Sequence, residues 1–389
     1  MEVLVTFILF YLLTTTTVLL INRSEFTPLL PPDRMEPSGD LPLVSLCVPA
    51  RNESRSIKRC VDSLLDQTYP NLEIWVLDDR STDGTTEILN HLAAQRPADL
   101  HVIHGDPKPD GWLGKPWACH QLSRSAGGSI LLFADADTVL EKDTVSRVVA
   151  SLQQENLDML TVWPKQQLGT FWEKTVVPLV YHALLTLLPA RYVYRDPRWL
   201  PRPLRKTFAP MFAAACGQFI AFRSHCYQVI GGHSSVQSRV VEDVELARLV
   251  KRAGFRMKMY HGEASISCRM YTDGRELEMG FRKNFLAGFN YRVPLFVMMG
   301  LLHLLVFIVP LIGAPIYLAG GQYLLGGGFA AALLLIFFQR FLLAIWFNWN
   351  SWYGLLHPLG VLWFIKLAVV SLIDYYWQRT VQWKDRPIR

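Results

Sequence analysis

The sequence lacks the local signatures of several common binding sites. Its six cysteines are scattered without any C-x-x-C pair, which argues against a disulfide framework or a zinc site and fits a reducing compartment. Neither G-x-G-x-x-G nor G-x-x-x-x-G-K-[ST] occurs, so a Rossmann dinucleotide site and a P-loop are both unsupported. The net charge is +6, but the basic residues do not cluster on one predicted face, so we expect no nucleic-acid partner.

Apolar residues, in contrast, are abundant. They make up 51% of the 389 residues, and the mean hydropathy is positive, which is high for a soluble enzyme. With this composition, a membrane surface and an anionic substrate are the expected partners of the excess positive charge.

The first apolar run, Val3–Ile21, is long enough to span a bilayer. It has no basic n-region and no small-residue cleavage site, so a retained anchor over residues 1–22 is favoured over the alternative, a cleaved signal peptide. The first basic residues, Arg23 and Arg34, follow the run, which by the positive-inside tendency makes the next segment cytoplasmic. Residues 23–42 are rich in proline and are expected to form a linker.

From residue 43 onward, short apolar runs alternate with helical patterns such as that of Ser54–Leu65. Strands are expected at Leu43–Val48, Leu72–Leu77, His101–Ile103, Ile130–Ala134, Asp158–Trp163 and Phe219–Phe222. This alternation predicts an α/β fold with a doubly wound parallel sheet.

Two carboxylates, Asp135 and Asp137, follow the strand at Ile130–Ala134 directly. In an open α/β sheet, ligands bind just beyond the carboxyl ends of the strands, and polar clusters also follow Val48 and Leu77. The two acids repel each other, and a hard divalent cation would relieve that repulsion. A Mg²⁺ or Mn²⁺ ion carrying a diphosphate is the expected occupant, although D-x-D by itself more often marks a solvated turn.

Four motifs occur in order along this part of the chain, namely V-P-A-R-N-E (48–53), V-L-D-D-R-S-T-D-G-T (76–85), G-K-P-W-A (114–118) and A-D-A-D (134–137). Together they resemble the family 2 glycosyltransferases of GT-A type, over roughly residues 43–270. The resemblance implies a GT-A doubly wound mixed sheet, mostly parallel, and a nucleotide-sugar donor, with a UDP-hexose as the preferred one.

The resemblance also implies a role for each motif residue. In the nucleoside pocket it places Pro49, Arg51, Glu53, Asp78 and Asp79, where Asp79 accepts a hydrogen bond from the base and Asp78 supports the turn. Near the diphosphate it places Lys115, Asp135 and Asp137, with Asp135 by the ribose and metal and Asp137 on the metal. A solvated lysine at a helix start is the alternative for Lys115.

Glu242 and Asp243 begin a predicted helix that stops at Gly254. Acids are common at helix starts because the helix dipole stabilises them, so a purely structural role is the alternative. The pair matches the family's third acidic motif. The resemblance therefore implies that Glu242 belongs to the donor site and that Asp243 is the general base of a direct displacement, which inverts the anomeric centre.

Processive members of the family carry Q-x-x-R-W farther along, and this chain does not. Its R-M-Y (269–271) and G-F-x-K-N (280–284) resemble instead the branch that glycosylates carotenoids, with hopanoid-associated relatives. We assign Arg282 to the donor phosphates. The equal alternative is that Arg269, Arg282 and Lys283 all lie at the membrane surface.

Residues 170–216 combine apolar stretches with basic and aromatic residues. We interpret them as an insertion that dips into the membrane interface, and an ordinary core insertion is the alternative. The expected catalytic domain, including this insertion, covers residues 43–290.

The composition becomes strongly apolar in residues 291–378, which are expected to form transmembrane helices, followed by a basic tail at 379–389. Spans are expected at Leu295–Leu318, with kinks at Pro310 and Pro315, at Tyr323–Phe338 and at Leu355–Ile373. Arg340 is expected to interrupt the apolar sequence after the second of these spans. Three full spans would leave the tail outside, against the positive-inside tendency. We therefore expect either a re-entrant or interfacial segment or a further crossing by Phe341–Trp349, and a cytoplasmic tail.

The sequence thus predicts a multi-pass membrane enzyme with a cytoplasmic catalytic domain. Its expected reaction is the inverting transfer of a sugar from a nucleotide sugar to a hydroxyl or carboxyl group of a lipid such as a carotenoid, hopanoid or other polyisoprenoid. A processive polysaccharide synthase and a catalytically inactive membrane scaffold are the alternatives.

Overall fold

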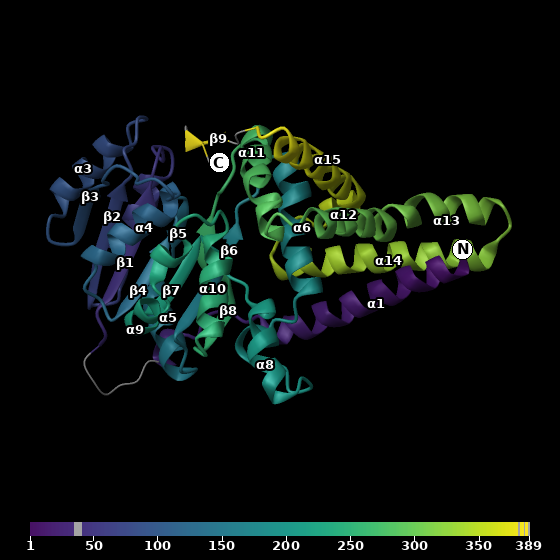
Figure 1. The fold of residues 1–389 in the computed structure, drawn as a ribbon, viewed down its shortest axis with the longest axis horizontal. Coiled ribbons are helices and arrows are strands. Elements are labelled where there is room, and N and C mark those ends of the chain that lie inside the picture. The colour runs from purple at the N-terminus through teal and green to yellow at the C-terminus, as the bar shows by residue number, and fades with distance from the viewer. Residues whose placement is uncertain (35–40, 380–381, 385, 388–389) are drawn as a thin grey trace. The chain divides into compact units, whose positions relative to one another are not determined.

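The computed structural model describes residues 1–34, 41–379, 382–384 and 386–387. It divides into two compact units (Figure 1). We call Phe26–Gln167 with Ala190–Met270 the sheet unit, and Met1–Glu25, Leu168–Pro189 and Tyr271–Arg389 the helical unit. Residues 271–290, which were expected in the catalytic domain, thus group with the helices.

The sheet unit contains a mixed sheet in the order β3-β2-β1-β4-β7-β6-β8-β5. Its strands are β1 (Val44–Ala50), β2 (Leu72–Asp78), β3 (Leu100–His104), β4 (Ile130–Ala134), β5 (Thr138–Leu140), β6 (Met159–Gln166), β7 (Phe219–Arg223) and β8 (Met257–Cys268). Strands β3, β2, β1 and β4 are parallel to one another, whereas β7 runs antiparallel to both β4 and β6. The expected mixed, mostly parallel sheet is confirmed.

The central strands form from continuous apolar runs because both faces of the sheet are covered. All five residues of β4 are buried, and Leu132 and Ala134 pack in the core with residues of the surrounding helices. The helices of this unit are α2 (Ile57–Leu65), α3 (Thr85–Gln95), α4 (Gly114–Ser125), α5 (Thr144–Gln154), α7 (Arg191–Tyr194), α8 (Arg202–Phe208), α9 (Ser224–Val229) and α10 (Glu242–Arg252), with 3₁₀ turns η1 (Pro32–Arg34), η2 (Ala209–Phe212) and η3 (Gly232–Val236).

Part of the expected linker at 23–42 belongs to the two folded units. Helix α1 continues to Glu25, and the following residues pack on the sheet unit instead of forming a free connection. Phe26 is fully buried, the His261 amide donates to the Thr27 carbonyl at 3.0 Å, and the Leu30 amide donates to Ser151 Oγ at 3.0 Å. Residues 35–40 of that linker lie outside the described part of the chain.

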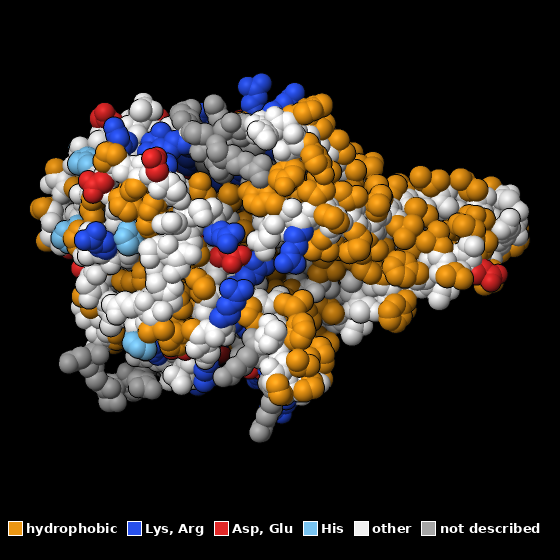
Figure 2. Space-filling model, in the orientation of Figure 1, with side chains coloured by type: hydrophobic (Ala, Val, Ile, Leu, Met, Phe, Trp, Pro, Cys, Tyr) orange, Lys and Arg blue, Asp and Glu red, His pale blue; other side chains and the backbone are white. Residues whose placement is uncertain are grey.

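The helical unit is built from α1 (Glu2–Glu25), α6 (Phe171–Leu187), α11 (Gly274–Phe285), α12 (Val293–Phe307), α13 (Val309–Ala319), α14 (Tyr323–Trp346) and α15 (His357–Tyr376), with 3₁₀ turns η4 (Ala287–Phe289) and η5 (Ser351–Leu356). The segments Glu2–Glu25, Val293–Ala319, Tyr323–Trp346 and Ser351–Tyr376 are long and apolar enough to cross a membrane. In Figure 2 the visible surface of α12, α13 and α14 is almost wholly hydrophobic, as lipid-facing helices require.

Two details of the apolar C-terminal part differ from expectation. Arg340 does not interrupt the chain, because α14 runs unbroken from Tyr323 to Trp346, so the proposed separate crossing by Phe341–Trp349 is wrong. A charged side chain leaves the backbone hydrogen bonds of a helix intact. The expected kink is present at Pro310, next to the break between α12 and α13 at Ile308, whereas Pro315 lies inside α13.

The segment at 170–216 does not behave as one insertion. Helix α6 groups with the helical unit, where it packs on α1 and α15. The part from residue 190 belongs to the sheet unit, to which Lys251 fastens it by donating to the carbonyls of Tyr192 and Val193 at 2.6 and 2.8 Å. Its α8–η2 region exposes large apolar side chains, including Met211.

Candidate active site

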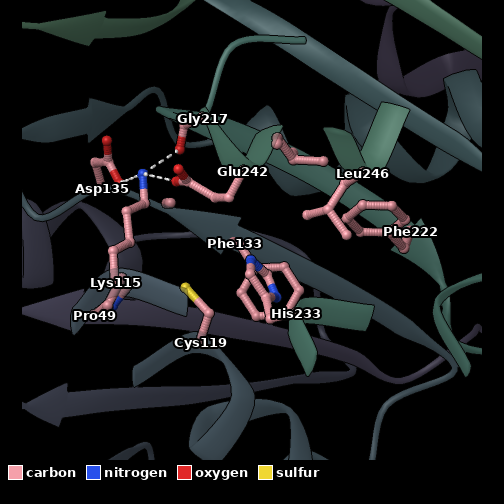
Figure 3. Close-up of a pocket in the computed structure, with 12 residues that line it drawn as sticks. Pro49, Lys115, Cys119, Phe133, Asp135, Gly217, Phe222, His233, Glu242 and Leu246 are labelled. Carbon is pink, nitrogen blue, oxygen red and sulfur yellow. Dashed lines mark hydrogen bonds and ion pairs between the residues drawn. The ribbon is translucent and has the colours of Figure 1, made fainter. Parts of the chain in front are cut away.

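A pocket opens in the sheet unit where β1 and β4 end and β7 begins (Figure 3). Because β1 and β4 are parallel, their carboxyl ends meet at one edge, and the Asp135 amide donates to the Gln218 carbonyl at 3.0 Å to bring in the start of β7. The pocket is lined by Pro49, Lys115, Cys119, Phe133, Ala134, Asp135, Gly217, Ile220, Phe222, His233, Glu242 and Leu246.

Lys115 is the central charge of this pocket. It lies in the first turn of α4, and its Nζ is 2.6 Å from Asp135 Oδ1 and 3.3 Å from Glu242 Oε1, and donates to the Gly217 carbonyl at 3.0 Å (Figure 3). Burial would lower the pKa of Lys115, but the carboxylates of Asp135 and Glu242 raise it well above its ordinary value. The ammonium is therefore charged at neutral pH and points at the strand ends, toward Asp135 and Glu242.

Asp243 is held rigidly at the start of α10. Its Oδ2 accepts from the Gly217 amide at 2.7 Å, and its Oδ1 accepts from the Val244 amide at 2.8 Å. Burial and the neighbouring Glu242 carboxylate raise the pKa of Asp243 to about 6, against the opposing effects of Lys115 and of these two amides. The carboxyl group is mainly ionised at neutral pH and has a pKa close to that pH, which suits a general base.

Gly217 makes this arrangement possible. A Cβ atom at this position would lie 3.2 Å from both Asp243 Oδ2 and Lys115 Nζ. A side chain here would therefore push apart the groups that the backbone of Gly217 holds together.

Asp135 and Asp137 flank the short connection between β4 and β5. The Thr138 amide and hydroxyl close this turn on the Asp135 carbonyl, at 3.1 and 2.7 Å. Asp137 lies beside the buried thiol of Cys268, whose pKa is raised first by burial and then by the Asp137 carboxylate. The two acids are thus close in sequence, but their side chains have different neighbours.

Over the described part of the chain, no three histidine, cysteine or acidic residues stand together as a ready metal cluster. Mg²⁺ and Mn²⁺ do not require one, since Mg²⁺ usually binds one or two carboxylates and completes its shell with phosphate oxygens and water. Asp135 and Asp137 supply oxygen ligands of the right kind, so the residues present fit such an ion when a diphosphate comes with it.

The ends of β1 and β2 are joined by a network that involves most of the predicted nucleoside-site residues. Arg51 Nη1 donates to the carbonyls of Asp79 and Arg80 at 2.7 and 3.0 Å, and the Asp79 amide donates to the Ala50 carbonyl at 2.7 Å. Glu53 Oε2 accepts from the Ser56 hydroxyl at 3.0 Å. These contacts bring the first two motifs together at the strand ends.

Both oxygens of Asp78 are used within the chain. Oδ1 accepts from the Ser81 amide at 3.1 Å and Oδ2 from the Thr86 hydroxyl at 2.5 Å, so the side chain closes the turn between β2 and α3. Asp83 acts similarly nearby: burial would raise its pKa, but hydrogen bonds from Thr85 and Ser54 lower it to about 2. Asp79, in contrast, follows the strand end and is buried beside Arg51.

Arg282 is not among the residues that line this pocket. It lies on α11 in the helical unit, where its Nε and Nη2 both donate to the carboxylate of Asp374 on α15. Its assignment to the donor phosphates stays a prediction, and the observed partner is a bidentate ion pair between two helices.

Sequence reasoning missed His233, which lines the pocket from η3. Its Nδ1 is 2.7 Å from the Tyr227 hydroxyl, and its ring meets that of Phe133 edge-on at 4.8 Å. Burial, and then the charge of Lys115, lower its pKa to about 3, so the ring is neutral. No motif marks this histidine; only the left-handed Gly231-Gly232 turn before it signals a tight bend.

Comparison with known proteins agrees with this architecture. The model of the family "Glycosyl transferase family 2" matches residues 45–228, which include β1, β2, β4 and β7. This stretch contains every predicted donor-site residue except Glu242 and Arg282.

Curated relatives extend the similarity beyond that domain. The chain is 24% identical over 352 residues to 4,4'-diaponeurosporenoate glycosyltransferase of Staphylococcus aureus (strain MRSA252), covering 88% of this chain and 87% of the relative. It is 23% identical over 270 residues to the protein of the same name from Staphylococcus haemolyticus (strain JCSC1435), covering 66% of this chain and 64% of the relative.

A solved structure shares the fold. The mannosyltransferase PcManGT from Pyrobaculum calidifontis, determined with GDP-Man and Mn²⁺, superposes with a TM-score of 0.54 at 15% identity, covering 97% of this chain and 99% of that one. The fold is therefore GT-A, and the family domain together with these relatives supports glycosyltransferase activity.

Proposed function

Because residues 45–228 form a glycosyl transferase family 2 domain, we propose that the protein is an inverting glycosyltransferase that moves a sugar from a nucleotide sugar to a membrane lipid. The acceptor group is a hydroxyl or a carboxyl, and the donor is a UDP-hexose. The carotenoid acceptor in the name of the curated relatives and the lipid-compatible helices of this chain support a polyisoprenoid acceptor.

The observation that carries this proposal is the convergence of Lys115, Asp135, Glu242 and Asp243 around Gly217. Lys115 from α4 and Asp243 from α10 both bind the backbone of Gly217, and Asp135, which follows β4, and Glu242 from α10 pair with Lys115. A carboxylate whose pKa is raised toward neutrality beside a charged lysine, in a pocket at the strand ends, is typical of a catalytic site.

In the proposed reaction, the acceptor oxygen attacks the anomeric carbon from the face opposite the diphosphate, and the bond from that carbon to the diphosphate oxygen breaks. Asp243 takes the proton of a hydroxyl acceptor, while a carboxylate acceptor needs no proton removed. Lys115 offsets the negative charge that develops on the departing diphosphate. The displacement inverts the configuration at the anomeric carbon.

Asp135 and Asp137 would hold Mg²⁺ or Mn²⁺, which supplies further charge compensation on the diphosphate. The Mn²⁺ in the PcManGT complex supports use of a divalent ion in this fold. Lys115 Nζ lies 2.6 Å from Asp135 Oδ1. The diphosphate of a bound donor and the Asp135 carboxylate would therefore interact with the same ammonium group.

The membrane arrangement follows from the same proposal. We propose that α1 anchors the chain, that the sheet unit lies in the cytoplasm, where nucleotide sugars are available, and that the helical unit brings it to a bilayer-soluble acceptor. A catalytic unit tied to lipid through segments before and after it fits a substrate that never leaves the membrane.

The decisive experiment compares lipid extracts from cells with and without the protein by mass spectrometry. A hexose-mass difference on a pigment or terpenoid supports the proposal, and unchanged lipids contradict it. With purified protein, UDP release from UDP-hexose should require Mn²⁺ or Mg²⁺ and stop with chelator. Release that is unaffected by chelator would remove the metal from the proposal.

A further inference from the structure

A buried arginine in the helical unit has two nitrogens without a hydrogen-bond partner among the described residues. Arg340, on α14, is only 3% exposed, and its Nε and Nη1 have no hydrogen-bond partner. Within the described ranges no carboxylate forms an ion pair with it. An isolated charge in an apolar interior is costly, because neither water nor a counter-charge replaces its lost hydration. A guanidinium in this position therefore calls for an anion that the chain itself does not supply.

A second set of unsatisfied groups lies beside it. His357, the first residue of α15, is 1% exposed, and both of its ring nitrogens lack a partner. Its ring is 4.9 Å from that of His182 and 4.6 Å from that of Phe307. Gln339, the residue before Arg340, contacts His182 at 2.8 Å, which brings this part of α14 to the same two histidines. Unpaired nitrogens from α14 and α15 thus share one small region.

The neighbouring polar group cannot serve as the missing acceptor. Gln339 Oε1 is 2.8 Å from His182 Nε2, and its Nε2 donates to the hydroxyls of Thr16 and Thr15 at 2.7 and 3.1 Å. Gln339 therefore links α14 to α1 and α6 and is fully used. The amide of Gln339 is thus fully hydrogen-bonded, whereas two guanidinium nitrogens of Arg340, the next residue, are not. This difference indicates that Arg340 does not serve to join the helices.

Arg340 lies near the C-terminal end of α14. It lies six residues before the helix ends at Trp346, a rise of about 9 Å. Trp349 and Trp352 follow in the next turn, and tryptophans are typical of the membrane–water boundary. η5 packs against the base of the arginine side chain, since a Cβ on Gly354 would lie 3.4 Å from Arg340 Cβ.

We propose that Arg340 and His357 form a site for the anionic headgroup, a carboxylate or a phosphate, of a membrane lipid. The headgroup accepts hydrogen bonds from the guanidinium in the paired geometry that arginine gives to both anions, and the acyl or isoprenoid chain lies along the apolar helices. Displacement of the short η5 turn opens the site. The site does not depend on the proposed sugar transfer and would exist in an inactive protein as well.

The test measures thermal unfolding of the full-length protein in neutral detergent after delipidation. Phosphatidylglycerol or palmitate, which carry the two candidate headgroup types, should raise the unfolding midpoint by at least about 4 °C, whereas phosphatidylcholine should not. A response to palmitate alone identifies a carboxylate ligand, and a response to phosphatidylglycerol alone identifies a phosphate. An equal response to all three lipids would overturn the proposal.

Two further arms separate a lipid site from its alternatives. Inorganic phosphate should give no shift, and a full shift with it would show that a soluble anion binds instead. Arg340→Met should abolish the lipid-dependent shift without lowering the basal midpoint, because it removes an unpaired buried charge. Lys366→Met is the matched control: Lys366 lies in α15 of the same unit, is exposed and pairs with Glu278 at 2.9 Å, so the variant should respond to lipid like the wild type.

If Arg340→Met does not fold, Arg340→Lys answers the same question. It keeps the charge but loses the paired donors, and it should retain only part of the shift. A full wild-type shift in either variant would contradict the proposal.

Discussion

At the residue scale, the site depends on how one glycine joins two charged side chains. The amide of Gly217 donates to Asp243 and its carbonyl accepts from Lys115, so the proposed base and the lysine are bound to the same residue. The identities of these charged residues were predictable from the motifs. Their connection was not, because Lys115, Gly217 and Asp243 are far apart in the sequence.

Asp243→Asn should lower the transfer rate by about 10²–10⁴-fold, the usual contribution of a general base, for a hydroxyl acceptor. Donor binding, measured by calorimetry with a UDP-hexose, should remain. Glu245→Gln is the control, since Glu245 on the same helix pairs with Arg248 and does not line the pocket. Normal turnover in the Asp243 variant would assign the base elsewhere.

The pH dependence of the rate should report Asp243. Because its pKa is raised to about 6 and the base must be ionised, kcat/KM should be constant above that pH and fall tenfold for each pH unit below it. The measurement is a pH–rate profile between about pH 4.5 and 8. A profile that stays flat through pH 5 would contradict the assignment.

Gly217→Ala should lower activity roughly tenfold, because the added methyl group would lie 3.2 Å from both Asp243 Oδ2 and Lys115 Nζ and shift both. Gly127→Ala is the control, since its Cβ would meet only Glu73 Oε1, at an ordinary 3.7 Å. Equal kcat values for the two variants would show that the spacing around Gly217 does not matter.

At the scale of elements, the main surprise is the segment that follows α1. Its prolines and polar residues predicted a linker, but Phe26 and Leu29 are buried on the sheet unit. Local composition could not show this, because isolated apolar residues form no period and their burial depends on a partner surface far away in sequence. The same limit applies to α14. The charge of Arg340 predicts the end of an apolar span, but the helix continues through this residue to Trp346.

Phe26→Ala should destabilise the sheet unit by about 3–5 kcal/mol, as expected for removal of a fully buried phenylalanine ring. The ring also meets His261 edge-on at 5.7 Å. Thermal unfolding followed by fluorescence should show a midpoint lowered by several degrees. Phe7→Ala, on the exposed face of α1, should leave it nearly unchanged, and equal effects would mean that the segment does not support the fold.

At the scale of the whole molecule, the topology depends on the side of the membrane on which the basic tail lies. Three spans after the catalytic domain predicted a conflict with the positive-inside tendency. Within the helical unit, however, the last turn of α15 pairs Asp374 with Arg282 on α11, and β9 (Gln382–Trp383) contacts α11 as well. With the sheet unit in the cytoplasm, as proposed above, α11 begins on that side because it directly follows this unit in sequence. The tail is then predicted to be cytoplasmic, with α15 lying obliquely near the interface.

Cysteine labelling in intact cells tests this arrangement. A membrane-impermeant maleimide should modify Glu2→Cys from outside but should modify Arg379→Cys only after permeabilisation. Both positions are exposed, so the comparison depends on sidedness alone. Labelling of Arg379→Cys in intact cells would place the tail outside and would make α15 a full crossing.

The sequence by itself determined the fold class, the family resemblance and the four segments that fit membrane spans. It could do so because buried parallel strands, long apolar helices and strand-end carboxylates each leave a continuous local pattern. Only the tertiary structure decided that Arg282 pairs with Asp374, that His233 lines the pocket, and that two nitrogens of the buried Arg340 have no hydrogen-bond partner among the described residues. These facts depend on which distant segments pack together, and hydrophobic periodicity carries no information about that.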